Sequence, residues 1–249
     1  MPRLQNKRCI VTGAASGIGR ATAEAYVQEG AKVVIADINR EKGIAAANAL
    51  GDAVQFIHLD SKSPESIKTL IAQAVQWLGG LDVLVQNAGV QFSGPVTDFD
   101  IKNWDNTFAI NVRAYFLGVK YAVPHMRGNG GSIINMASVA GRKGAPGMSC
   151  YASSKGAVIA MTGALGRELA PENIRVNAVC PGWIETAFNA ASIRNLGGPD
   201  IQKAVIEKNV PMKRQATPSE VAPIFVYLAS DEASYVTCQA YAIDGGLTQ

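Results

Sequence analysis

The sequence contains very little histidine: His58 and His125 are the only two among 249 residues. Histidine is the side chain that most often acts as a general acid or base near pH 7. Acid–base chemistry in this protein would therefore rely on another residue type. A zinc site is not expected either, because the cysteines at 9, 150, 180 and 238 form no CxxC pair or other metal-ligand spacing.

Long apolar runs and strong charge are also missing. No apolar stretch is long enough to span a bilayer, and MPRLQNKR at the start contains no apolar signal region. The net charge of +3 is small and its lysines and arginines are scattered, which argues against a nucleic-acid partner. We expect a cytoplasmic protein with reduced, packed cysteines and with no metal and no membrane partner.

Short β-branched runs alternate with segments of helical apolar spacing along the whole chain. Helices are expected at 19–30, 66–78 and 154–169, and strands at 8–12, 32–37, 54–59, 81–86, 131–138, 174–180 and 239–244. Near-continuous apolar strands separated by helices are typical of a parallel sheet covered on both faces. The pattern predicts an α/β protein: one Rossmann domain over residues 1–249, with a doubly wound, seven-stranded parallel sheet.

One region, residues 183–218, is irregular and contains the helix breaker Gly197-Gly198-Pro199. It lies between the sixth and seventh predicted strands, near the carboxyl end of the sheet. Folds of this class bind ligands at that end. We therefore expect the region to form a lid over the substrate.

A glycine-rich loop, TGAASGIG, follows the first strand and opens the first helix. Gly13, Gly17 and Gly19 would allow a tight turn and a close approach of the backbone to a ligand. The first helix then offers free N–H groups and the positive end of its dipole to a pyrophosphate. A merely structural glycine-rich turn is the alternative, but a strand before the loop and a helix after it favour dinucleotide binding.

Asp37 ends the second strand, 18 residues after Gly19. A carboxylate at this place can accept hydrogen bonds from the ribose hydroxyls of NAD and repel the 2′-phosphate of NADP. Asp37 could also cap the next helix, and both roles are compatible. We expect NAD as the cofactor, although nearby Arg40 leaves NADP open.

These residues join a longer series of motifs. Asn87-Ala88-Gly89 follows the fourth strand, Asn111 lies in a helix, Ser138 follows the fifth strand, and Tyr151 and Lys155 form Y-x-x-x-K. Pro181-Gly182 with Thr186, and Asp244-Gly245-Gly246, complete the series. Tyr151 is the only one of seven tyrosines with a lysine four residues on. In order and spacing, the series resembles the short-chain dehydrogenase/reductase family over essentially the whole chain. The sequence departs from the family's usual residues at Gln86, Gly156 and Cys238, which leaves details of strand edges and helix packing open.

The resemblance implies roles for these residues. Tyr151 would be the acid–base group, Ser138 would hold the substrate oxygen, and Asn111 would organise a water that links Lys155 to solvent. Lys155 would also hold the nicotinamide ribose, Thr186 and the backbone of Ile184 would meet the carboxamide, and Asp60 would accept from the adenine amine. By chemistry alone, Asp60 could equally cap a helix near Ser63, Ser138 could cap its strand end, and Asn111 could be a satisfied helix residue. The full set of expected cofactor-binding residues is Gly13, Ser16, Gly17, Ile18, Gly19, Asp37, Asp60, Asn87, Tyr151, Lys155, Pro181, Gly182, Ile184 and Thr186.

The Tyr–Lys pair has a physical rationale. Free tyrosine titrates near ~10, so a tyrosine base at pH 7 needs its pKa lowered by about three units, which is roughly 4 kcal/mol. A cation about 5 Å away at an effective dielectric of about 20 supplies around 3 kcal/mol. A lysine at i+4 on a helix can lie at such a distance. We therefore expect Lys155 to lower the pKa of Tyr151, with the positive nicotinamide ring adding to the effect.

The expected activity is NAD-dependent hydride transfer between a secondary alcohol or ketone and nicotinamide. The substrate could be a sugar, polyol, hydroxy acid or cyclic alcohol. Expected pocket walls are Gln91, Ala140, Arg142, Met148, Trp183 and Phe188. Two alternatives stay open: an NADPH-dependent 3-ketoacyl carrier-type reductase, and a non-catalytic NAD-binding regulator, which would be marked by loss of the catalytic residues.

A homotetramer is expected, because the helices around 108–123 and 154–169 are apolar on much of their circumference and must be buried. The family commonly packs these two helices across an interface between subunits. The C-terminal residues 247–249 could reach a neighbouring subunit.

Overall fold

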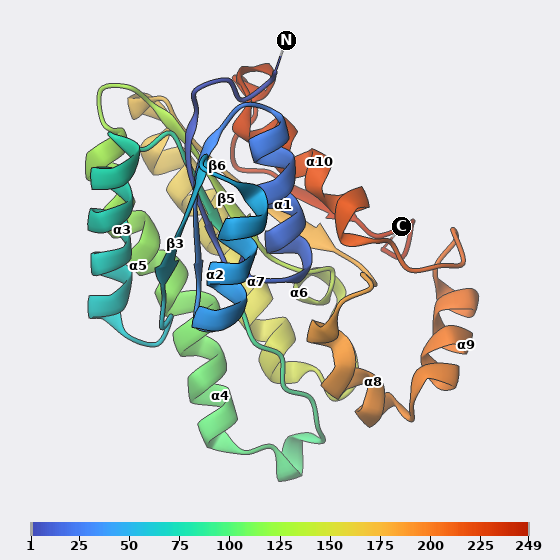
Figure 1. The fold of residues 1–249 in the computed structure, drawn as a ribbon. Helices are drawn as coiled ribbons and strands as arrows, with labels where there is room; N and C mark the ends of the chain where they lie inside the picture. The colour runs from blue at the N-terminus through green and yellow to red at the C-terminus, as the bar shows by residue number, and fades with distance from the viewer. Residues whose placement is uncertain (1, 249) are drawn as a thin grey trace.

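The structure is a computed structural model that describes residues 2–248 and, at Ala191, the backbone alone. It confirms the predicted fold class. Seven parallel strands form one sheet in the order β3-β2-β1-β4-β5-β6-β7, and helices surround this sheet (Figure 1). The strands are β1 (Arg8–Thr12), β2 (Lys32–Asp37), β3 (Val54–His58), β4 (Val83–Gln86), β5 (Gly131–Met136), β6 (Ile174–Pro181) and β7 (Ala240–Ile243).

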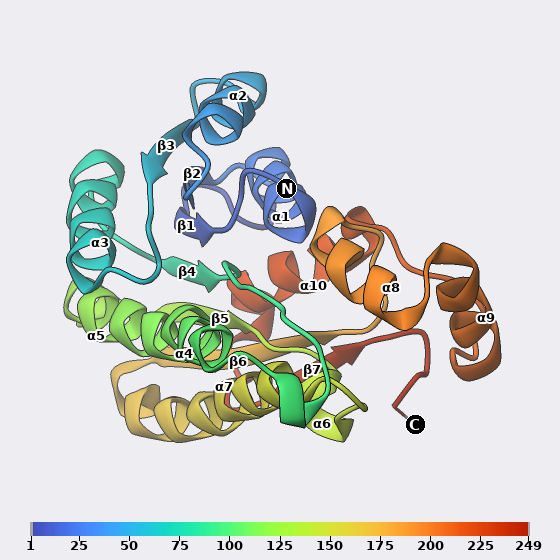
Figure 2. The ribbon, with the colours of Figure 1, turned by 90° about the horizontal axis from the view of Figure 1, so that it is seen from below.

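Helices cover both faces of the sheet. One face packs against α1 (Gly17–Gln28), α2 (Arg40–Leu50) and α10 (Pro218–Ala229), and the other against α3 (Pro64–Leu78), α5 (Ala114–Met126) and α7 (Ser149–Leu169). The view from below shows the two helical layers on either side of the strands (Figure 2). The central strands β1, β4 and β5 are almost entirely buried, as near-continuous Val and Ile runs require.

Most of the remaining helical segments lie at or near the carboxyl edge of the sheet. The connection from β4 to α5 contains η1 (Val96–Asp98), α4 (Ile101–Phe108) and a π-helical turn, η2 (Ala109–Arg113). Helix α6 (Ala140–Lys143) follows β5, and the connection from β6 to α10 contains η4 (Ala187–Asn189), α8 (Ala190–Leu196) and α9 (Pro199–Asn209). The short helices η3 (Ala170–Glu172) and η5 (Asp231–Ala233) lie elsewhere, before β6 and after α10. In Figure 2, α8 and α9 lie side by side beyond the sheet.

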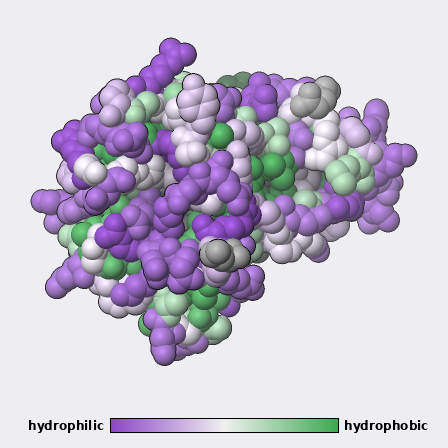
Figure 3. All heavy atoms as spheres, turned by 90° about the horizontal axis from the view of Figure 1, so that it is seen from above, coloured by the Kyte–Doolittle hydropathy of each residue, from purple (hydrophilic) through white to green (hydrophobic). Residues whose placement is uncertain are grey.

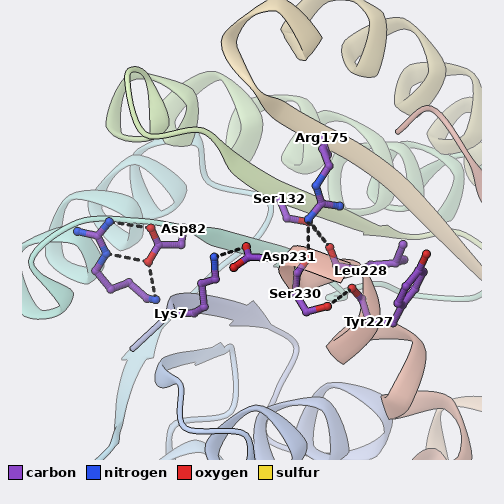
Figure 4. Close-up of polar contacts among 9 residues, drawn as sticks. Lys7, Asp82, Ser132, Arg175, Tyr227, Leu228, Ser230 and Asp231 are labelled. Atoms are coloured by element: carbon purple, nitrogen blue, oxygen red, sulfur yellow. Dashed lines mark hydrogen bonds and ion pairs between the residues drawn. The ribbon is translucent and has the colours of Figure 1, made fainter. Parts of the chain in front are cut away.

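The amino edge of the sheet is held by polar contacts that range from half-buried to exposed (Figure 4). The Arg175 guanidinium donates to the Leu228 carbonyl at 2.8 Å and to the Ser230 carbonyl at 3.2 Å, where α10 ends. A cation at this position satisfies carbonyls that the helix leaves unpaired and complements the helix dipole. Ion pairs of Arg8 with Asp82 and of Lys7 with Asp231 complete this edge at 2.7 Å each.

Two departures from the family's usual residues have a local explanation in packing. Gln86 is buried, and its side-chain amide donates to the Asn135 side-chain oxygen at 2.9 Å. The side-chain oxygen of Gln86 occupies the space that a Cβ on Gly118 would need. Cys238 adopts a left-handed backbone conformation with φ 62°, where glycine is favoured, and its sulfur faces Gly166. In both cases a glycine on the neighbouring helix makes room for the larger residue.

The surface seen from above is mostly hydrophilic, with small hydrophobic areas between the polar side chains (Figure 3). Within residues 2–248, no helix is both long and apolar enough to cross a membrane. All four cysteines are free thiols, and Cys9, Cys150 and Cys180 are buried. Three of the four cysteines are therefore packed in the interior, as expected, and Cys238 is half-buried.

Candidate active site

A cleft of about 1790 Å³ opens at the carboxyl edge of the sheet. Its walls come from the glycine-rich loop, the ends of β2, β4, β5 and β6, the first turns of α7, and α8. Most of the predicted site residues line it: Gly13, Ser16, Gly17, Ile18, Asp37, Asn87, Gln91, Ser138, Ala140, Met148, Tyr151, Lys155, Pro181, Gly182, Trp183, Ile184, Thr186 and Phe188. Four do not: Gly19, Asp60, Asn111 and Arg142.

The glycine-rich loop is shaped by close backbone contacts. Gly13 has φ +64°, and a Cβ on it would lie 2.7 Å from the Cα of Ala88. Gly19 lies behind the loop, where a Cβ would collide with the Gly13 carbonyl oxygen. Asn87 braces the turn from β4, because its side-chain amide donates to the carbonyls of Thr12 and Gly13 at 2.9 and 3.0 Å.

Helix α1 begins at Gly17 with an open N-terminus. The Ser16 side chain makes no capping hydrogen bond, and no acidic residue lies in the first turn. The first N–H groups of the helix are thus left for an anion, and the helix dipole favours negative charge there. The loop and helix together fit the pyrophosphate of a dinucleotide.

Replacing Gly13 by alanine should weaken binding of a dinucleotide by about 30-fold or more. The new Cβ would collide with Ala88 and the backbone would be strained at φ +64°, and such strain costs on the order of 1–3 kcal/mol. Isothermal titration with NADH would measure the loss. Gly163→Ala in α7, where a Cβ meets nothing within 4 Å, is the matched control and should leave the affinity unchanged; equal loss in both variants would contradict this role of the loop.

Asp37 is held rigidly at the end of β2. One of its carboxylate oxygens accepts from the N–H of Ala15 at 3.1 Å and the other from the N–H of Asn39 at 2.9 Å. Asn39, rather than Asp37, caps α2 through its side chain. The Asp37 carboxylate is therefore oriented in the cleft wall by backbone donors.

Asp60 is used locally. Its carboxylate accepts from the N–H of Lys62 at 2.9 Å, its own N–H donates to the Ser66 hydroxyl, and Ser63 is the residue that caps α3. Asp60 therefore does not cap α3, contrary to the helix-capping alternative; it stabilises the turn just before the cap residue. The side chain does not line the cleft.

Tyr151 and Lys155 lie one turn apart near the start of α7, and both side chains are buried at 7% and 1% exposure. The Lys155 ammonium donates to the Met136 carbonyl at 2.7 Å and lies 5.8 Å from the centre of the Tyr151 ring. Ser138 follows β5, and its hydroxyl accepts from the Ala140 N–H at 3.1 Å. Tyr151, Lys155 and Ser138 all line the cleft.

The pKa values in this cluster run opposite to the sequence-based expectation for Tyr151. Burial raises the pKa of Tyr151 to about 12, and the Ser138 hydroxyl offsets this only in part. Burial also lowers the pKa of Lys155 to about 7. The difference arises because burial removes both side chains from water. Desolvation disfavours the charged form of each group, so it raises the pKa of the tyrosine and lowers that of the lysine, and it outweighs the attraction between the two charges. The free protein therefore holds a neutral phenol beside a lysine that loses its proton near neutral pH.

Asn111 lies behind this cluster in the π-helical turn between α4 and α5. It is fully buried, and its amide pairs with the N–H and carbonyl of Val90, each at 2.9 Å, and donates to the Ser154 hydroxyl at 3.1 Å. A Cβ added at Gly89 would lie 3.2 Å from the Asn111 side-chain oxygen and 3.7 Å from the Lys155 nitrogen. Asn111 and Lys155 thus border the same space, and a π-helical turn is often found at functional sites.

The cleft also contains residues that the sequence patterns did not single out. Ser93, Ser192 and Asn195 line it, and the Asn195 amide donates to the Ser93 hydroxyl at 2.8 Å across the cleft. The spacing in the sequence could have indicated Ser192 and Asn195, because residues four and seven positions after Phe188 lie on the same face of a continuing helix. Arg142 is exposed outside the cleft, and Lys143 lines the cleft in its place.

Comparisons with known proteins agree with this geometry. A family profile described as Enoyl-(Acyl carrier protein) reductase matches residues 13–248. The chain is 40% identical over 249 residues to a 3-oxoacyl-[acyl-carrier-protein] reductase of Thermotoga maritima, covering 98% of this chain and 99% of the relative. It is 38% identical over 255 residues to a trans-4-hydroxycyclohexanecarboxylate dehydrogenase of Sinomonas cyclohexanicum, covering 99% and 94%.

A solved structure is similar over nearly the whole fold. The short-chain dehydrogenase/reductase described as a glucose/ribitol dehydrogenase from Brucella melitensis superimposes with a TM-score of 0.92, at 34% identity, over 99% of this chain and 98% of that one. Fold, motif series and full-length sequence similarity all lead to one assignment. The chain belongs to the short-chain dehydrogenase/reductase family of nicotinamide-dependent oxidoreductases.

Proposed function

We propose that this protein is an NAD-dependent dehydrogenase that interconverts a secondary alcohol and a ketone, with Tyr151 as the acid–base group. The observation that carries the proposal is the placement of Tyr151, Lys155 and Ser138 in the cleft that also contains the glycine-rich loop. The cleft thus combines a proton-transfer group with a dinucleotide cradle. A regulator that had lost catalysis would not need all three side chains.

The residues present fit a dinucleotide. Backbone N–H groups after Ser16 and Gly17 would take the pyrophosphate, Asp37 would accept from the adenosine ribose, and Lys155 would hold the nicotinamide ribose. Ile18, Pro181, Gly182, Ile184 and Thr186 line the same cleft and would contact the nicotinamide half. When bound, the cofactor supplies the hydride acceptor for oxidation or the hydride donor for reduction.

The protein's own residues handle the proton. Ser138 would hold the substrate oxygen while the Tyr151 oxygen takes the proton of the alcohol. The neutral Tyr151 phenol can take that proton only if it passes on its own in the same step. Because the pKa of Lys155 is about 7, an unprotonated Lys155 amine is available near neutral pH to receive it. With the pKa of Tyr151 at about 12, transfer between these two groups alone is uphill, so it is coupled to the loss of the alcohol proton and the three groups titrate as a unit. Asn111, beside the space next to Gly89, would position a water that passes this proton towards solvent.

Residues 183–218 would act as the substrate lid. Both ends of the segment meet in a short parallel bridge, where the Ala216 N–H donates to the Trp183 carbonyl and the Glu185 N–H donates to the Ala216 carbonyl. Between these ends, α8 and α9 extend away from the sheet (Figure 1). Because both ends of the segment meet at this bridge, the residues between them can move together as one unit with the bridge as the hinge.

The cofactor choice can be tested at Asp37. Replacing Asp37 by serine should shift the ratio of the NADP+ to NAD+ dissociation constants at least 100-fold towards NADP+, because the fixed carboxylate repels a 2′-phosphate and binds a ribose diol. Calorimetric titration of wild type and variant with both cofactors measures this. Asp60→Ser is the matched control, and a wild-type preference for NADP+ would contradict the assignment of NAD.

A second candidate function is supported by the relative from Thermotoga maritima, a 3-oxoacyl-[acyl-carrier-protein] reductase. That activity would use the same three catalytic side chains in the reductive direction. Oxidation of NADPH, but not NADH, in the presence of an acetoacetyl thioester would favour this candidate over the alcohol dehydrogenase.

We also propose that the protein assembles as a homotetramer. Helices α4 and α5 expose apolar side chains that an interface between subunits would bury: Ile101 at 68%, Phe116 at 50% and Trp104 at 37% exposure. Light scattering should give a mass near four times the 26.2 kDa of one chain. A monomeric mass, or a tetramer that survives the substitution Phe116→Asp unchanged, would contradict this assembly.

A further inference from the structure

We infer that the cleft recognises a second, uncharged hydroxyl group of the substrate through α8, with Ser192 as the specificity-determining residue. The substrate would then be a diol, polyol or sugar-like alcohol rather than a hydroxy acid or a wholly apolar alcohol. This inference rests on the proposed dehydrogenase function. It adds the substrate class and a residue that recognises it.

The position of α8 fixes the geometry. Phe188 lies against the reacting tyrosine, with 6.3 Å between the ring centres of Phe188 and Tyr151. The helical path continues from η4 into α8, so Ser192 lies one turn, or about 6 Å of helical rise, beyond Phe188. Asn195 lies a further three residues along the same face. A substrate whose carbinol meets Tyr151 would extend past Phe188 towards these two side chains.

Ser192 has hydrogen-bonding capacity that the protein does not use. Its hydroxyl oxygen is buried and has no partner among the described residues. A buried hydroxyl without a partner is unfavourable, and most such groups are paired. Because a serine χ1 has three staggered rotamers, the side chain can turn towards the cleft that its residue lines, where a substrate hydroxyl would satisfy it.

The neighbouring polar groups also suit a neutral hydroxyl. The Asn195 amide donates to the carbonyl and hydroxyl of Ser93 at 3.1 and 2.8 Å, which uses both of its N–H bonds and leaves its oxygen as an acceptor. Among residues 2–248, the Gln91 amide donates to one acceptor, the Met148 sulfur at 3.7 Å, which is a weak acceptor. Hydroxyl and amide groups of this kind both accept from and donate to an alcohol.

Among the described residues, the same wall of the cleft offers a substrate carboxylate no buried cation to bind. Of the charged side chains that line the cleft within residues 2–248, Lys155 alone is buried, and its ammonium already donates to the Met136 carbonyl. Lys143, the other lysine in the lining, is exposed. A carboxylate beside Ser192 and Asn195 would face the Asn195 side-chain oxygen, which can only accept, and would have no buried cation of the described chain to pair with, whereas a neutral hydroxyl can donate to that oxygen.

The test uses three substrates on one ring: cyclohexanol, trans-1,4-cyclohexanediol and trans-4-hydroxycyclohexanecarboxylate. With intact protein and saturating NAD+, kcat/KM for the diol should exceed that for each of the other two by about tenfold, the value of one satisfied hydrogen bond. In Ser192→Ala, the ratio of kcat/KM for the diol to kcat/KM for cyclohexanol should fall by at least fivefold. Ser234→Ala, an exposed serine outside the cleft, is the matched control.

The outcomes separate the two proposals. Equal rates for diol and cyclohexanol, preference for the carboxylate, or an unchanged diol advantage in Ser192→Ala would each overturn this inference while leaving the dehydrogenase assignment intact. Failure to oxidise the diol when another secondary alcohol is oxidised would do the same. If no alcohol yields NADH although NAD+ binds, the proposed function fails, and the inference fails with it.

Discussion

Tyr151→Phe should lower kcat for alcohol oxidation by about 10³-fold, within the ~10²–10⁴ range of a general acid–base group, and leave the dissociation constant of NADH within about twofold. The substitution removes one oxygen from a side chain that is 7% exposed. No other phenol lines the cleft among the described residues, and both histidines lie outside it. Steady-state kinetics and calorimetry on the same preparation measure the two effects.

Tyr115→Phe is the matched control for this prediction. Tyr115 is also buried, its ring lies 5.4 Å from the Lys155 nitrogen, and its hydroxyl donates to the Ala88 carbonyl at 3.1 Å. It does not line the cleft. The variant should lose about 1 kcal/mol of stability, the value of one hydrogen bond, and keep most of its activity. A large loss of kcat in Tyr115→Phe, or little loss in Tyr151→Phe, would show that the proton-transfer group is misassigned.

Lys155→Met should lower kcat/KM for oxidation by about 10²–10³-fold and also change its pH dependence. In wild type, kcat/KM should rise as Lys155 loses its proton near pH 7 and level off above, because its pKa is about 7. In the variant the first group left to ionise is Tyr151, with a pKa of about 12. Its activity should therefore keep rising through alkaline pH with no plateau.

The direction of reaction gives an internal check on the Lys155 prediction. Oxidation needs a group that accepts a proton and gains from rising pH, whereas reduction of the ketone needs a proton and should lose rate over the same range. Lys143→Met, at an exposed lysine in the cleft lining, should leave both profiles as in wild type. A plateau near pH 7 that persists in Lys155→Met would mean that another group controls the proton.

The sequence predicted the sheet well, because its strands are apolar on both faces. The runs 8–12 and 32–37 match β1 and β2 residue for residue, and the predicted strand at 131–138 ends two residues beyond β5. Buried parallel strands produce nearly continuous runs of β-branched residues, and these runs are visible without any knowledge of the neighbouring strands.

Features that depend on neighbours far along the chain were not predictable in the same way. The pairing of Gln86 with Asn135 depends on the space at Gly118, and the tie between Asn195 and Ser93 joins residues 102 positions apart. The π-helical turn at Asn111 is set by its hydrogen bonds to Val90 and Ser154. The pKa expectation for Tyr151 was wrong for the same reason: its spacing from Lys155 was visible, but the burial of both side chains was not.

The most direct test of the central claim is a single-turnover absorbance measurement at the NADH band. Wild type, Tyr151→Phe and Tyr115→Phe would each be mixed with NAD+ and a panel of secondary alcohols, with cofactor binding measured in parallel. We predict that at least one alcohol produces NADH with wild type and Tyr115→Phe, and that the rate falls about 10³-fold with Tyr151→Phe at unchanged NAD+ binding. Equal rates in wild type and Tyr151→Phe, or NAD+ binding with no NADH from any alcohol, would contradict the account.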